Sequence, residues 1–70
     1  MNNYEMLCIA KLFSLAMGYS SVRPTKVELE VATEVIKKMV DNNLNLNQQQ
    51  KEMYKFMLDI AKERIKTLDR

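Results

Sequence analysis

Residues 25–41 read TKVELEVATEVIKKMVD and show the clearest helical pattern in the chain. Thr25 followed three residues later by Glu28 forms a capping box, which predicts a helix over about residues 26–41. Apolar residues recur every three or four positions, the spacing that places them on one face of an α-helix. This apolar stripe comprises Leu29, Val31, Ala32, Val35, Ile36, Met39 and Val40.

The stretch that follows, residues 41–50, reads DNNLNLNQQQ and contains seven side-chain amides. We expect Asn42 and Asn43 to end the preceding helix, because Asn tolerates the left-handed conformation found at helix C-termini. We expect Leu44 and Leu46 to hold the loop against the core, so that it is a short ordered connection. Candidate caps for the next helix are Asn45 with Gln48 and Asn47 with Gln50.

A further amphipathic helix is predicted over about residues 48–68, with lysines on the side opposite its apolar arc. Because the connecting loop is short, we expect this helix and the one over residues 26–41 to form an antiparallel hairpin. The apolar arc comprises Met53, Phe56, Met57, Ile60, Ala61, Ile65 and Leu68, flanked by Tyr54 and Leu58.

The residues before Gly18 predict a third helix, over about residues 3–17. Asn2 followed by Glu5 is an arrangement like a capping box, and Gly18 suits the left-handed residue that ends a helix. The apolar side chains of this helix point in nearly every direction, which is typical of a helix at the centre of a bundle or in an interface. They are Met6, Leu7, Cys8, Ile9, Leu12, Phe13, Leu15 and Met17.

The sequence therefore predicts an all-α three-helix bundle in one small domain, residues 1–70. A chain of this length buries only about 60% of the surface that its unfolded form exposes. Cys8 is the only cysteine and there is no histidine, so neither a disulfide nor a usual zinc site is available. We therefore expect a homo-oligomer. The residues expected at the oligomer or partner interface are Leu12, Phe13, Met17, Tyr19 and Arg64.

Two features of the predicted helices leave alternatives open. Most of the six methionines fall at core positions, so we expect them to fill the core; the alternative is an adaptable apolar groove for partner helices. Arg64 lies near the centre of the apolar arc of the last helix. It either extends its guanidinium to solvent or meets an acidic residue of another chain.

The sequence contains no catalytic, metal-binding or phosphate-binding pattern. It lacks histidine, and we expect Cys8 to be a small buried apolar residue, so no nucleophile and base are paired. A single glycine excludes the glycine-rich loops that bind phosphates. We expect no enzymatic activity, no metal and no cofactor.

We expect instead a small interaction module that self-associates and acts as an adaptor, regulator or inhibitor by binding a larger protein. The net charge of +2 comes from 11 basic and 9 acidic residues, a balance that indicates neither a nucleic-acid nor a membrane-surface protein. The apolar N-terminal segment fits neither a signal peptide nor a membrane span, so we expect a cytoplasmic protein. The short chain, rich in Asn, Lys and Ile, is typical of phage or mobile-element genes, in which case the compartment is the host cytoplasm.

The alternative function is DNA binding by a helix-turn-helix. The start of the helix over residues 48–68 would read bases with Gln48 and Gln49, while Lys51 and Lys55 would contact phosphates. A loop of about six residues is longer than the turn of that motif. We therefore rank nucleic acid below a protein partner.

Overall fold

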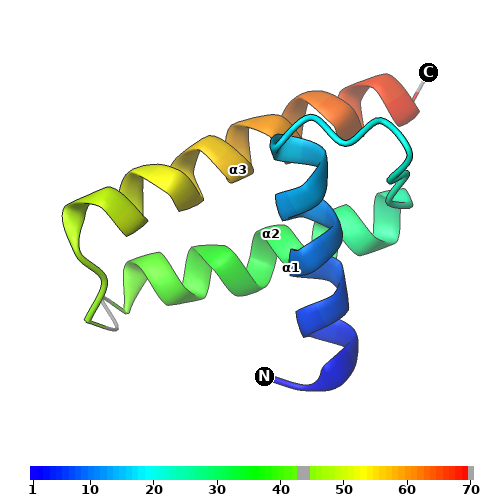
Figure 1. Ribbon diagram of the computed structural model, residues 1–70. Coiled ribbons are helices and arrows are strands. Elements are labelled where there is room, and N and C mark those ends of the chain that lie inside the picture. The colour runs from blue at the N-terminus through cyan, green and yellow to red at the C-terminus, as the bar shows by residue number, and fades with distance from the viewer. Residues whose placement is uncertain (43–44, 70) are drawn as a thin grey trace.

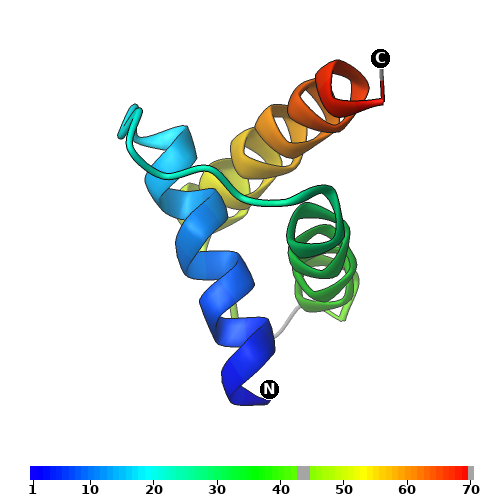
Figure 2. The same cartoon turned by 90° about the vertical axis from the view of Figure 1, so that its right-hand side faces the viewer.

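The computed structural model describes residues 1–42 and 45–69, which form three α-helices and no strands (Figure 1). They are α1 (Asn3–Ala16), α2 (Lys26–Asp41) and α3 (Gln48–Leu68). Each helix contacts both of the others, with α1 lying across α2 and α3 (Figures 1 and 2). The predicted all-α three-helix bundle is therefore confirmed.

All three helices start with a capping box. In each, the cap side chain accepts a hydrogen bond from the backbone N–H three residues on, and that residue's side chain accepts one from the cap N–H, at 2.8–3.1 Å. A cap of this kind stabilises a helix by about 1 kcal/mol. The three pairs are Asn2 with Glu5, Thr25 with Glu28 and Asn47 with Gln50.

Helix α1 ends at Ala16, one residue before the predicted end, and Met17 caps it in the right-handed conformation. Gly18 follows with φ +93°, as expected for a left-handed residue after a helix. The Gly18 N–H donates to the Leu15 carbonyl (3.0 Å) and the Tyr19 N–H to the Ser14 carbonyl (3.1 Å). These two bonds form a Schellman motif, which satisfies carbonyls that the helix leaves without a partner.

The loop after α2 differs in part from the prediction. Asn42 caps α2 in the right-handed conformation, and Asn45 instead has the positive φ, 55°. Leu46 is half-buried, and its contact with the core stays a prediction. Asn43 and Leu44 lie outside the described residues.

The core lies where the three helices meet, and each helix supplies part of it. Burying a large apolar side chain contributes about 1.5–3 kcal/mol, so a few such residues supply much of the stability of so small a domain. Cys8 is fully buried, as expected of a small apolar residue. The buried apolar residues are Cys8, Leu12, Leu29, Ala32, Ile36, Met57 and Ala61.

Two ion pairs join residues far apart in the sequence. The Lys11 Nζ of α1 lies 2.5 Å from a Glu28 carboxylate oxygen of α2, and this hydrogen bond lowers the pKa of Glu28. The backbone N–H of Thr25, which also donates to this carboxylate, lowers that pKa further. Lys26, at the start of α2, lies 2.6 Å from Asp69, just after α3, and the pairing raises the pKa of Lys26.

Candidate functional site: an apolar groove between the three helices

Many apolar side chains of α1 and α3 lie outside the core. Phe13 of α1 is 42% exposed and Met53 of α3 is 44% exposed. Met6 and Phe56 are exposed to a similar extent. An excess of exposed large apolar residues on a small chain is typical of an interaction surface, provided that the residues are contiguous.

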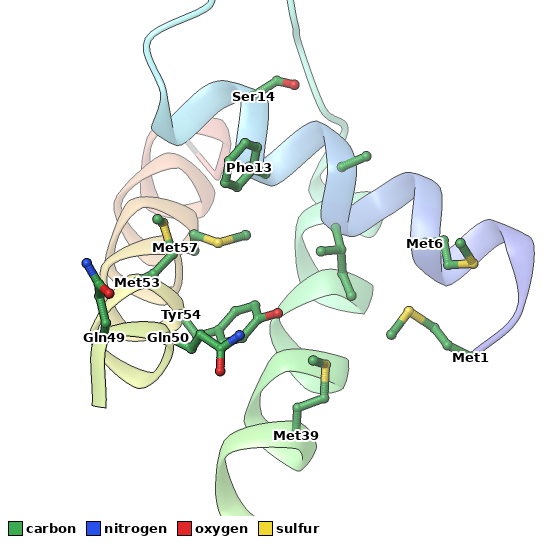
Figure 3. A pocket seen from close by; sticks show the side chains of 12 residues that line it. Met1, Met6, Phe13, Ser14, Met39, Gln49, Gln50, Met53, Tyr54 and Met57 are labelled. Carbon is green, nitrogen blue, oxygen red and sulfur yellow. The ribbon is translucent and has the colours of Figure 1, made fainter. Parts of the chain in front are cut away.

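Several of these side chains surround one groove, with a volume of about 680 Å³ (Figure 3). The groove is bounded by all three helices and is open to solvent on its remaining side. In Figure 3, the Phe13 ring of α1 lies beside the Met53 and Met57 side chains of α3. The lining residues are Met1, Met6, Ile9, Ala10, Phe13, Ser14, Met39, Gln49, Gln50, Met53, Tyr54 and Met57.

Helical periodicity places the residues of the two long walls. On α1, Met6, Ala10 and Phe13 are spaced by four and three residues and therefore lie along one side of the helix. On α3, Met53 and Met57 are spaced by four in the same way. Since Leu12 and Phe13 are adjacent, 100° apart around α1, the helix directs Leu12 into the core and Phe13 into the groove.

Five of the six methionines line this groove; only Met17 does not. The expectation that most methionines fill the core is wrong, because Met57 alone is fully buried. Most methionines lie outside the core because α1 is apolar around nearly its whole circumference and α3 has a broad apolar face. Together these helices carry more apolar surface than three crossing helices can cover. Met side chains are flexible and polarisable, and such residues are used at binding surfaces that accept partners of different shape.

None of the residues lining the groove has a charged side chain. Its polar side-chain groups are the Ser14 and Tyr54 hydroxyls and the amides of Gln49 and Gln50. Burying an ionised ligand group without an opposite charge is unfavourable, so the groove suits an apolar occupant with few hydrogen-bonding groups. In Figure 3 the Tyr54 hydroxyl and the Gln50 amide lie close together at one edge of the hollow.

The predicted interface residues divide into three groups. Leu12 has no exposed surface and belongs to the core of its own chain, so its assignment to an interface is wrong. Phe13 lines the groove. Met17 and Tyr19 are exposed beyond the groove, and Arg64 is exposed on α3.

Three of the four residues of the predicted DNA-reading surface, Gln48, Lys51 and Lys55, lie within about 60° of one another around α3. Gln49 lies apart from them and lines the groove. Gln48 lies on the lysine side and donates a long hydrogen bond from its amide to Glu52 (3.4 Å). Nucleic-acid binding stays a prediction.

Sequence reasoning missed Met39, Gln50 and Tyr54 as residues of the site, because none stands out on its own helix. The available signal was the number of methionines, which favoured an adaptable groove as the alternative to core filling. Within residues 1–42 and 45–69 no group of three His, Cys, Asp or Glu side chains is placed to hold a metal ion. No helix in the described part of the chain is long and apolar enough to cross a membrane.

No protein-family model, no curated protein and no solved structure matches this chain.

Proposed function

We propose that this protein is a non-enzymatic interaction module that binds a larger protein through the apolar groove and acts on it as an adaptor, regulator or inhibitor. The observation that carries the proposal is the groove itself, a hollow of about 680 Å³ with no charged side chain in its lining, which includes five methionines and Phe13. A partner would remove these side chains from water at about 25 cal/mol for each Å² of apolar surface covered. We place this activity in the cytoplasm, or in the host cytoplasm if a phage encodes the chain.

The proposal takes α2 and α3 as an antiparallel hairpin that supports the groove. The ion pair between Lys26 and Asp69 supports this arrangement, because it joins the first residue of α2 to the residue after α3. The loop between Asp41 and Gln48 is short enough for neighbouring antiparallel helices.

We further propose that the chain self-associates through the exposed outer side of α1 and the residues that follow it. Met17 and Tyr19 are exposed there, and a chain of 70 residues gains stability from association. Met17→Lys should lower the solution mass measured by light scattering without loss of helicity, because this side chain is already 58% exposed. A wild-type protein that stays monomeric at all concentrations would contradict self-association.

The groove is tested by replacing Met53 with a photo-crosslinking amino acid and irradiating cells that produce the protein. The matched control is the same replacement at Leu68, which lies on the same helix with nearly the same exposure, 45%, but outside the groove. We expect crosslinks to a second protein from position 53 and not from position 68. Equal crosslinking from the two positions, or none from position 53, would contradict the proposal.

A further inference from the structure

We infer that the occupant of the groove is a single amphipathic α-helix of another protein, with large apolar residues on one face and basic residues along one edge of that face. This inference rests on the proposed function and specifies the partner's chemistry.

The first reason concerns the backbone of the occupant. Every backbone N–H and C=O that is removed from water needs a hydrogen-bond partner. An extended peptide would have to find such partners on the protein, but the described residues form no strand whose edge could pair with it. The groove itself offers two hydroxyls and two amides. A helix satisfies its own backbone, so it is the peptide conformation that an apolar groove can bury.

The second reason is the shape of the groove. A cavity of roughly 150 Å³ holds one benzene-sized group, so about 680 Å³ has room for roughly four large side chains. A helix presents that many apolar side chains on one face over about three turns, at spacings of three and four residues. With α1, α2 and α3 around it, such a helix would complete a four-helix arrangement.

The third reason is the distribution of charge along the two walls. The α1 wall carries no charge on its groove side, where Met6, Ala10, Phe13 and Ser14 lie. The outer edge of the α3 wall carries Glu52 and Phe56, four residues apart, and Glu63 continues this line about two turns beyond Phe56, where it pairs with Lys66 at 3.7 Å. All three are exposed. A docked helix with Lys or Arg on the edge that faces α3 would therefore meet opposite charge, which selects its orientation more than it adds affinity.

Two designed peptides test this inference on the full-length protein. Both carry Leu and Phe at the same helical positions; one has lysines along one edge of the apolar face, and the other has glutamates at those places. Binding is measured by fluorescence anisotropy for the wild type, Met53→Gln, Leu68→Gln and Glu52→Lys. The Leu68→Gln variant controls for the loss of an equally exposed apolar residue of α3 outside the groove.

We expect the lysine-edged peptide to bind the wild type and Leu68→Gln equally, and Met53→Gln about tenfold or more weakly. Glu52→Lys should weaken this peptide by a few fold and favour the glutamate-edged one, since exposed charge pairs contribute little. The effect of Glu52→Lys should fade in high salt.

Three results of the binding measurements would overturn the inference: neither peptide binds, Met53→Gln binds as the wild type does, or the wild type prefers the glutamate-edged peptide. A solution mass that falls on Met53→Gln substitution would also overturn it, because the occupant would then be a second copy of this chain. If neither peptide binds while position 53 still crosslinks to a protein, the inference of a helical partner is wrong and the proposed function stands. If neither peptide binds and position 53 gives no crosslink, the proposed function is wrong as well.

Discussion

Met53 and Met57 lie one turn apart on α3, yet Met57 is 1% exposed and Met53 is 44% exposed. The same contrast separates Leu12 from Phe13 on α1. In both pairs the residue types are similar, and the difference comes from which side of the helix the other two helices cover. Apolar character alone therefore does not distinguish the core of this protein from its groove, and the two regions should respond differently to substitution.

Substitutions in the core should lower the free energy of unfolding more than substitutions elsewhere. Leu12→Ala removes a fully buried side chain and leaves a cavity, so we expect the free energy of unfolding to fall by about 3–5 kcal/mol. Phe13→Ala, on the groove side, should lower it by about 1 kcal/mol or less, although more atoms are removed. Urea unfolding followed by circular dichroism measures both. Similar losses for the two variants would show that the groove is packed like the core.

Capping substitutions should give the next largest effect. Thr25→Ala removes the side-chain acceptor at the start of α2, with an expected loss of about 1 kcal/mol of unfolding free energy. Asn47→Ala should cost a similar amount at the start of α3, beside the groove. Because a cap acts locally, we expect the two losses to add in the double variant, as measured by thermal unfolding. A strongly non-additive result would indicate that the two helix starts are coupled.

Acid should weaken the ion pair between Lys11 of α1 and Glu28 of α2, which lies on the side of α1 that faces away from the groove. The pKa of Glu28 is lowered in the folded protein by Lys11, so its stabilising contribution is complete above the unfolded pKa, about 4.5, and is lost as the pH falls through the folded value. Glu28→Gln keeps an acceptor for the capping box but removes the charge. Its melting temperature should lie below that of the wild type at neutral pH, and the difference should vanish in acid. A difference that persists at low pH would contradict the assigned role of the charge.

Groove substitutions should have the smallest effect on stability. We expect Met53→Gln to change the free energy of unfolding by no more than about 0.5 kcal/mol, since this side chain is already in contact with water. Chemical denaturation measures the free energy of unfolding of Met53→Gln and of Leu68→Gln, and we expect the two variants to show equally small changes. A loss of several kcal/mol at Met53 alone would place this residue in the core.

The helices were predictable from sequence because their signals are local. Each capping box occupies four consecutive residues, and the left-handed residue after α1 is the only glycine. Such patterns need no knowledge of the rest of the chain. The end of α2 was less predictable, since several asparagines follow one another and Asn45 rather than Asn42 takes the positive φ.

The groove could not be predicted in the same way. A helix that is apolar all round, as α1 is, does not reveal from its own sequence which side meets α2 and α3. Leu12 was for this reason assigned to an interface, although it is fully buried within the chain. The groove depends on how α1 crosses the other two helices, which is set by packing between residues far apart in the sequence.

The most direct test of a solvent-filled groove beside a separate core is a methyl NMR measurement on protein labelled with ¹³C-methyl methionine. A soluble paramagnetic probe, added to a dilute sample, broadens the methyl signals that solvent can reach. We predict strong broadening for Met6 and Met53 and protection for Met57, with Met53 becoming protected when the lysine-edged peptide is added. Protection of Met53 equal to that of Met57 in the free protein at every dilution would contradict the account, because the groove would then be part of the core.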